Sequence, residues 1–225
     1  RDRIKCCHDF KIKKLISCLS TCIFPNDTTY PINESMLHNG APHNSNDAYS
    51  YAKRMIEVHS KAYREQYNDN FVCVIPTNVY GEYDNFSLED GHVVPALIHK
   101  CYLAKQNNES FVVFGSGKPL RQFIYSTDLA KLILWVLENY TGEPIILSPN
   151  ENDEVSIKDI AELIANEFNY NNIEFDISKS DGQYKKTADN TKLLNLYGEF
   201  KFTPIEEGIK NSVNWFINNY EIARK

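Results

Sequence analysis

Long apolar runs, clusters of basic residues and internal repeats are all missing from this sequence of 225 residues. No apolar run approaches the roughly 20 residues that a membrane-spanning helix needs, so we expect no membrane association. The only concentrated basic stretch is Lys11 to Lys14 and the formal net charge is -6, so we expect no nucleic-acid partner. With 42% hydrophobic and 24% charged residues, the composition indicates one globular core with at most a small additional lobe.

A secretory signal peptide is not visible either, although two features are typical of secreted proteins. There are six cysteines, and four Asn-x-Ser/Thr sequons begin at Asn26, Asn85, Asn108 and Asn139. However, Cys18 and Cys73 lie within apolar runs, where a free cysteine behaves as a small hydrophobe. We therefore expect reduced thiols and a cytoplasmic protein, and no metal site.

The hydrophobic pattern predicts strands that alternate with helices, which is typical of an α/β fold with a parallel sheet covered on both faces. Strands are expected at Lys14 to Leu19, Phe71 to Ile75, Phe111 to Phe114, Leu120 to Tyr125, Pro144 to Leu147 and Ile173 to Ile177. Helices are expected near the N-terminus and at Asp47 to Gln66, Val93 to Lys105, Leu129 to Glu138, Ile157 to Phe168, Lys192 to Leu196 and Pro204 to Tyr220. Between them, residues 26 to 46 are rich in Pro, Asn and His and predict a long loop.

Three of these helices carry further signals. Between Asp47 and Gln66, apolar residues recur every three or four positions and predict a face packed on the sheet: Ala48, Tyr51, Ala52, Met55, Val58, Ala62 and Tyr63. Ser126-Thr127-Asp128 is expected to cap the helix that starts at Leu129. Ser156-x-x-Asp159 predicts a capping box for the helix that starts at Ile157.

The segment from Asn46 to Arg54, NDAYSYAKR, sets Tyr49 and Lys53 four residues apart at the start of a predicted helix. One helical turn places both side chains on the same face. An ammonium beside a phenol favours the phenolate, which makes the phenol a better proton donor near neutral pH. Such pairs are also common on solvated helix faces, so the spacing alone does not identify an active site.

Polar residues also follow two predicted strands at the ends where ligands bind in open α/β sheets. Ser20 and Cys22 follow the first strand, and Pro76-Thr77-Asn78 follows the second. The order strand, Ser, Tyr-x-x-x-Lys helix, strand, Pro-Thr-Asn resembles the extended short-chain dehydrogenase/reductase superfamily. Within it, four segments together resemble the GDP-L-fucose synthase family: STCIFP, HNSNDAYSYAKRM, VIPTNVYGEYDNF and DGHVVPALIHK.

The resemblance implies a Rossmann-like doubly wound parallel sheet with a smaller C-terminal substrate-binding lobe, mainly from residues 82–122 and 150–225. It also implies NADP(H) as cofactor, a nucleotide-sugar substrate and a homodimer. The implied reaction is NADPH-dependent 3,5-epimerisation and 4-keto reduction of GDP-4-keto-6-deoxy-D-mannose to GDP-L-fucose.

A glycine-rich turn that cradles the cofactor pyrophosphate is part of the family pattern, yet neither G-x-G-x-x-G nor G-x-x-G-x-x-G occurs here. We therefore expect residues 1–225 to be an NAD-dependent epimerase/dehydratase-type domain that is incomplete at its N-terminus. Expressed alone, such a chain should expose the edge of its first strand, associate, and bind NADP(H) weakly.

The resemblance assigns catalytic roles to five residues. In the reduction, Tyr49 donates a proton to the carbonyl oxygen, Lys53 supports it and binds the nicotinamide ribose, and Ser20 polarises the same carbonyl. In the epimerisation, Cys22 is the base and His92 is the acid. Apart from the family pattern, Cys22 is typical of a structural thiol and His92 of an ordinary surface or core histidine.

Binding roles follow from the same resemblance. The cofactor is expected to contact Ser20, Tyr49, Lys53, Pro76, Thr77, Asn78, Val79 and His92. The substrate is expected to contact Asn78, Lys100, Phe114, Arg121, Asp181 and Lys186. The planar guanidinium of Arg121 suits a diphosphate. Lys100 stands where some members have Arg, and Phe114 where many have Trp, so a bidentate fork and an indole donor are absent. The loop with Asp181 and Lys186 could also be a solvated turn.

Two other functions stay open. One is a different nucleotide-sugar epimerase, dehydratase or reductase of the same superfamily. Cys22 with His92 argues against it, because dehydratases and 4-epimerases usually carry Thr with acidic residues near these positions. The other is a catalytically silent dinucleotide-binding or scaffold fragment, which the intact catalytic set disfavours.

Overall fold

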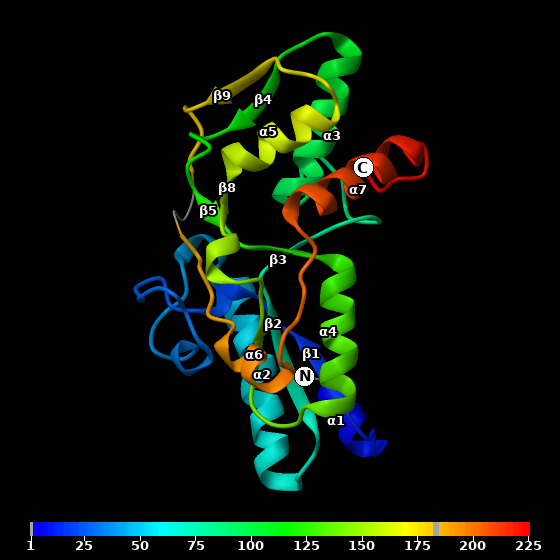
Figure 1. Cartoon of the computed structure of the whole chain (residues 1–225). Coiled ribbons are helices and arrows are strands. Elements are labelled where there is room, and N and C mark those ends of the chain that lie inside the picture. The colour runs from blue at the N-terminus through cyan, green and yellow to red at the C-terminus, as the bar shows by residue number, and fades with distance from the viewer. Residues whose placement is uncertain (1, 182–184) are drawn as a thin grey trace. The chain divides into compact units, whose positions relative to one another are not determined.

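The computed structural model describes residues 2–181 and 185–225, and the chain divides into two compact units (Figure 1). Unit 1 comprises Arg1–Thr77, Leu129–Glu151 and Thr187–Phe200. Unit 2 comprises Asn78–Asp128, Asn152–Lys186 and Lys201–Lys225. Each unit is therefore assembled from three separate stretches of sequence.

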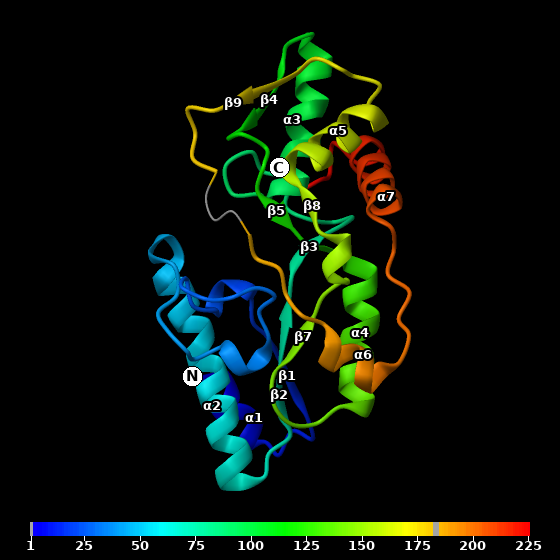
Figure 2. The ribbon, with the colours of Figure 1, turned by 60° about the vertical axis from the view of Figure 1, so that its left-hand side comes forward.

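Unit 1 is built on a parallel sheet with the strand order β1-β2-β7. The strands are β1 (Leu15–Cys18), β2 (Phe71–Pro76) and β7 (Ile145–Leu147). β2 lies in the middle and all six of its residues are buried, as expected for a parallel strand covered on both faces. Helix α2 (Asp47–Tyr67) lies on one side of this sheet and α4 (Ser126–Asn139) on the other (Figure 2). Helices α1 (Asp2–Asp9) and α6 (Thr191–Tyr197) complete the unit.

The loop between β1 and α2 is long, as predicted, but it contains short turns of 3-10 helix. These are η1 (Thr21–Ile23), η2 (Glu34–Met36) and η3 (Asn44–Asn46). The carboxylate of Glu34 accepts a hydrogen bond of 2.9 Å from the backbone N–H of Ile146 in β7. Ile32 also forms a parallel bridge with Ala188. These contacts hold the loop against the sheet and so fix the position of the residues that follow β1.

The prediction of which face of α2 packs on the sheet is wrong. The buried residues of this helix are Ser50, Arg54, Glu57 and Ser60. Tyr51, Met55 and Val58 are instead 49%, 50% and 41% exposed. Periodicity locates an apolar stripe but does not say what covers it, and here small or hydrogen-bonded residues face the rest of unit 1.

Unit 2 contains three pairs of short strands. They are β3 (Asn78–Tyr80) parallel to β6 (Phe123–Tyr125), β4 (Phe111–Phe114) parallel to β9 (Ile173–Asp176), and β5 (Leu120–Arg121) antiparallel to β8 (Val155–Ser156). Helices α3 (Val93–Asn107), α5 (Ile157–Glu167) and α7 (Ile205–Asn218) pack together over one core, and η4 (Glu151–Asp153) precedes β8. The core includes Phe86, Phe111, Ile160 and Phe216, each 0% exposed.

The α/β class is confirmed, and so are the predicted helices and five of the six predicted strands. The stretch predicted as one strand from Leu120 to Tyr125 divides into β5, which is antiparallel to β8, and β6, which is parallel to β3. The capping box of Ser156 and Asp159 is confirmed. The predicted cap of α4 is wrong, because the helix begins at Ser126 and these residues form its first turn. β3 and β8 were missed because strands of two or three residues are too short to show a period.

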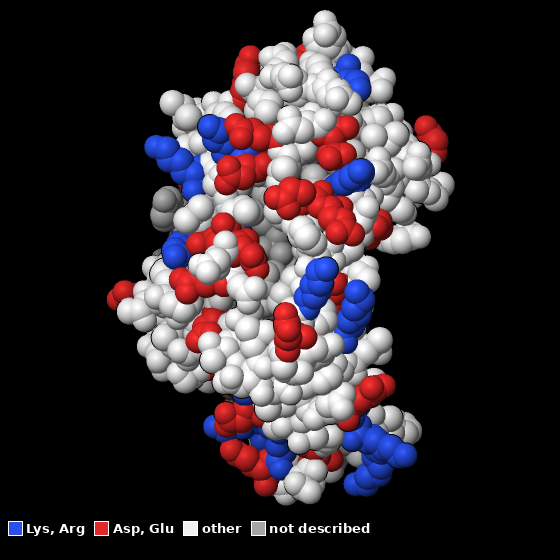
Figure 3. Space-filling view, in the orientation of Figure 1, with Lys and Arg blue, Asp and Glu red and all other residues white. Residues whose placement is uncertain are grey.

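Lys and Arg side chains are interspersed with Asp and Glu on the face drawn in Figure 3. None of the helices in the described residues combines the length and the apolar character that crossing a bilayer requires. All six cysteines lie in the described residues, and none of them forms a disulfide.

Candidate active site

Ser20 and Cys22 lie in unit 1, directly after the carboxyl end of β1. Ser20 is the N-cap of η1, and its Oγ accepts a hydrogen bond of 3.3 Å from the backbone N–H of Cys22. Both residues are half-buried. Because Oγ is the acceptor in this bond, the hydroxyl hydrogen of Ser20 can be donated to a carbonyl oxygen.

Tyr49 and Lys53 lie one turn apart in the first half of α2, as the spacing predicts. Lys53 Nζ is 5.7 Å from the centroid of the Tyr49 ring and donates a hydrogen bond of 2.8 Å to the carbonyl oxygen of Cys18. Tyr49 is 49% exposed. η1 packs against α2. Unit 1 therefore brings four of the predicted catalytic residues onto two adjoining segments.

Pro76 and Thr77 lie at the carboxyl end of β2, next to β1, and both are buried. Thr77 Oγ1 makes no hydrogen bond among the described residues. A buried hydroxyl with no partner is costly, and at the carboxyl end of a parallel strand a ligand is one way to satisfy it. An ammonium at Lys53 and a hydroxyl at Thr77 fit the hydroxyl-rich ribose of a dinucleotide, so the donors of unit 1 fit NADP(H).

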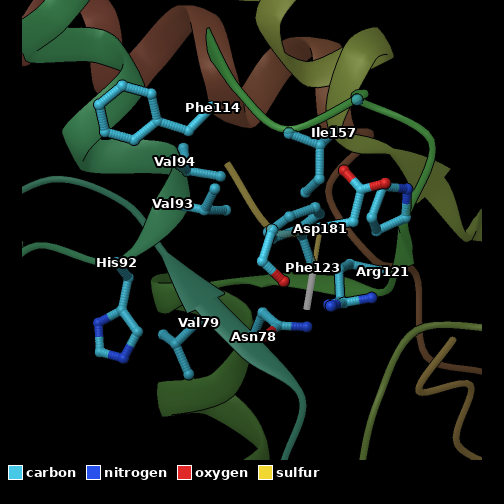
Figure 4. A pocket seen from close by; sticks show the side chains of 13 residues that line it. Asn78, Val79, His92, Val93, Val94, Phe114, Arg121, Phe123, Ile157 and Asp181 are labelled. Atoms are coloured by element: carbon cyan, nitrogen blue, oxygen red, sulfur yellow. The ribbon is translucent and has the colours of Figure 1, made fainter. Parts of the chain in front are cut away.

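Unit 2 has a cavity of about 350 Å³ that is lined by six of the predicted site residues. They are Asn78, Val79, His92, Phe114, Arg121 and Asp181 (Figure 4). Sequence reasoning missed the apolar part of the lining, which includes Val94, Phe123 and Ile157. Val94 lies in the same GHVVP segment as His92, but no pattern separates Phe123 and Ile157 from ordinary core residues.

Asn78 is held at the start of β3 by two hydrogen bonds to one acceptor. Its backbone N–H and its Nδ2 both donate to the carbonyl oxygen of Gln122, at 3.2 and 2.9 Å. His92 is the exposed N-cap residue of α3 and makes no side-chain capping bond. Burial raises the pKa of Asp84, and the hydrogen bond of 2.7 Å that its carboxylate accepts from the backbone N–H of Asn85 opposes part of that rise.

The basic residues predicted to bind substrate differ in their positions. Arg121 lines the cavity and donates a hydrogen bond of 2.7 Å to the carbonyl oxygen of Leu120. Lys100 is not part of the lining, whereas Phe114 is. The Nζ of Lys100 lies 3.5 Å from the centroid of the Phe114 ring. Burial lowers the pKa of the Lys100 ammonium. Lys186 is half-buried and is not part of the lining.

Asp181 lines the cavity, but its carboxylate is bonded to the turn at Ser116. It accepts hydrogen bonds from the backbone N–H and the Oγ of Ser116, at 2.6 and 2.7 Å, and these bonds lower the pKa of Asp181. A Cβ at Gly115, where φ is +86°, would collide with the same carboxylate. Asp181 therefore shapes the cavity wall by holding this turn.

These strands, helices and site residues match a known family. The family model described as NAD dependent epimerase/dehydratase family matches residues 3–147. The chain belongs to this family. Its mixed α/β structure with parallel strands agrees with that membership.

The relatives of this family member include GDP-L-fucose synthases. The GDP-L-fucose synthase of Dictyostelium discoideum is 57% identical over 224 residues, which are 99% of this chain and 70% of that protein. The probable GDP-L-fucose synthase of Drosophila melanogaster is 50% identical, over 97% of this chain and 71% of that protein. A crystal structure of a GDP-L-fucose synthetase from Naegleria fowleri bound to NADP is 54% identical with a TM-score of 0.96, over 99% of this chain and 69% of that chain.

Proposed function

We propose that this protein catalyses the NADPH-dependent 3,5-epimerisation and 4-keto reduction of GDP-4-keto-6-deoxy-D-mannose to GDP-L-fucose. The observation that carries the proposal is the 57% identity to a GDP-L-fucose synthase over 99% of this chain. The reaction needs a proton donor for a ketone and a base and acid for the neighbouring carbons. The chain holds candidates for each.

In the reduction, Tyr49 donates its proton to the oxygen of the ketone. Lys53 lies 5.7 Å from the Tyr49 ring, and its positive charge stabilises the phenolate that remains. Ser20 donates a hydrogen bond to the same ketone oxygen. NADPH, when bound, supplies the hydride. Lys53 has three N–H donors and uses one on Cys18, so two are left for the cofactor ribose.

In the epimerisation, Cys22 removes a proton from a carbon beside the ketone, and His92 returns a proton to the opposite face of the sugar. The C–H bonds are acidic because the negative charge left by the proton is delocalised onto the ketone oxygen as an enolate. The hydrogen bond from Ser20 to this oxygen stabilises the enolate further. A thiolate can accept a proton from such a carbon and an imidazolium can donate one, so the side-chain types of Cys22 and His92 suit these two steps.

The cavity of unit 2 takes the nucleotide-sugar. Arg121 contributes a planar, always charged donor fork for the diphosphate, and the apolar side chains of Phe123 and Ile157 cover the remaining surface. The ammonium of Lys100 lies on one face of the Phe114 ring, so a nucleotide base that stacks near this ring meets a positive charge. Asp181, which lines the cavity, and Lys186, which does not, are the remaining residues expected to contact the substrate.

We further infer that the protein is a cytoplasmic homodimer. The exposed apolar face of α2, formed by Tyr51, Met55 and Val58, supports pairing with a second copy, because apolar side chains gathered on one helix face favour association. Six cysteines without a disulfide support a reducing compartment.

The test is to mix the complete, folded protein with GDP-4-keto-6-deoxy-D-mannose and NADPH and to follow NADPH absorbance together with the sugar product. We expect NADPH to be consumed with one GDP-L-fucose formed per NADPH. A folded protein that forms no GDP-L-fucose would contradict the proposal. Formation of the unepimerised 4-reduced sugar would instead indicate a different nucleotide-sugar reductase.

A further inference from the structure

Arg54, the residue after Lys53 in α2, is a buried cation that contacts the segment carrying Ser20 and Cys22. It is 8% exposed. Its Nε donates a hydrogen bond of 2.5 Å to the carbonyl oxygen of Ile23, and one terminal nitrogen donates a bond of 2.7 Å to the carbonyl oxygen of Gly40. Arg54 therefore joins the end of η1 and the loop beyond it to the helix.

Lys53 and Arg54 bind the two ends of one short segment. Lys53 donates to the carbonyl oxygen of Cys18, before Ser20, and Arg54 donates to that of Ile23, directly after Cys22. The two bonds thus bracket the residues that carry the hydroxyl and the thiol. Because both cations belong to the helix that also carries Tyr49, they set the position of these side chains relative to the phenol.

Stability alone accounts poorly for a buried arginine at this position. Removing a guanidinium from water is costly, and a buried charge is often replaceable by an apolar residue without loss of stability. Here the hydrogen-bond partners in the described residues are neutral carbonyls, and the second terminal nitrogen has no hydrogen-bond partner among them. The two hydrogen bonds fix the position of the bound segment but add little to the stability of the fold.

We propose that Arg54 is a positioning residue that holds the Ser20–Cys22 turn in register with Tyr49, and that the epimerisation step depends on it. The importance of Cys22 as the base rests on the proposed function. The position of the turn does not, so it can be measured without any catalytic assay. A displacement of about 1 Å at a reacting group lowers a rate by about 100-fold.

The first experiment measures the alkylation rate of Cys22 in the folded complete protein by iodoacetamide and peptide mass spectrometry, with exposed Cys6 as the internal reference. Arg54→Met removes both bonds at similar side-chain length. We expect Cys22 to react about fivefold faster in this variant, because the turn is released and the thiol is more accessible. Arg54→Lys keeps the charge but can reach only one carbonyl, so its rate should fall between Arg54→Met and the wild type.

Arg64 supplies the matched control. It lies on the same helix, donates a hydrogen bond of 2.8 Å to the carbonyl oxygen of Phe71 and contacts Glu57 at 3.8 Å, but it does not bind the Cys18–Ile23 segment. Arg64→Met should lower the melting temperature without changing the alkylation rate of Cys22. If Arg54→Met does not fold, Arg54→Lys decides the question.

The second experiment follows exchange of the substrate C–H protons with deuterated solvent. We expect Arg54→Met to lower kcat for exchange by about 100-fold with little change in KM. Faster alkylation with slower exchange supports the proposal. An unchanged Cys22 alkylation rate in folded Arg54 variants would overturn the proposal. If alkylation is faster in Arg54→Met but even the wild type shows no exchange, the proposed function is overturned. The role of Arg54 in holding the turn then remains supported.

Discussion

Single residues separate the two proposed half-reactions, because reduction and epimerisation use different side chains. Tyr49→Phe removes the proton donor for the ketone but leaves Cys22 and His92 in place. We expect it to abolish NADPH consumption while the substrate still exchanges C–H protons with deuterated solvent, as measured by mass spectrometry.

Cys22→Ala is the complementary variant and should suppress that exchange by about 100-fold or more, since the base is removed. His92→Ala should suppress incorporation of solvent deuterium in the same way. Normal epimerisation by Cys22→Ala would show that another group is the base.

The buried thiols offer a test of burial at the same scale. Desolvation raises the pKa of Cys73 to about 11 and that of Cys101 to about 12, and both side chains are 0% exposed. At pH 8 a thiol of pKa 11 is only about one part in a thousand thiolate, and the thiolate is the reactive form. We expect iodoacetamide to modify exposed Cys6 in the folded protein, and Cys73 and Cys101 only after unfolding in urea. Equal rates for Cys6 and Cys73 in folded protein would contradict this structure.

Helix α5 has a well-defined start that can be tested as an element. The Oγ of Ser156 accepts from the backbone N–H of Asp159 at 3.0 Å, and the backbone N–H of Ser156 donates to the Asp159 carboxylate at 2.9 Å. Ser156→Ala removes the first bond and should lower the free energy of unfolding by about 1 kcal/mol. Urea unfolding followed by circular dichroism measures the loss.

Lys158→Ala is a suitable control for the cap. Lys158 lies in the same first turn, and its side chain makes an exposed pair with Glu162 at 3.6 Å, which contributes about 0.5 kcal/mol or less. Its backbone hydrogen bond to Gly117 is kept in the alanine variant. A loss for Ser156→Ala no larger than that for Lys158→Ala would mean that the capping box contributes nothing to stability.

At the scale of the whole molecule, the apolar face of α2 predicts how copies associate. A double substitution, Met55→Asp with Val58→Asp, places two carboxylates on the proposed interface, where they would lose water without a partner charge. We expect the complete wild-type protein to sediment as a dimer at micromolar concentration and the variant as a monomer.

Leu134→Asp is the matched control for this surface. Leu134 is 58% exposed on α4, so it is as accessible as Met55 but lies on another helix. Its substitution should leave the dimer unchanged. A wild-type monomer, or a dimer that survives the α2 substitutions, would place the interface elsewhere or exclude it.

The α/β class, most helices and strands, and six of the residues that line the cavity of unit 2 could be predicted from the sequence. Local features suffice for these: apolar periodicity marks α5, the Ser156 box marks its start, and the Tyr49 and Lys53 spacing puts both residues on one face of a helix. The family resemblance rested on short segments for the same reason, because each motif is contiguous in the chain.

The buried face of α2 could not be predicted from the sequence, because it depends on residues that are distant in the chain. Arg54 and Glu57 face inward because carbonyl and imidazole partners reach them from residues 23, 40 and 38, up to 31 positions away in the chain. The same holds for Asp181, whose carboxylate meets Ser116 across 65 positions. Hydrogen bonds between distant segments leave no periodic trace in a sequence, since each partner is set by the folded chain and not by its neighbours.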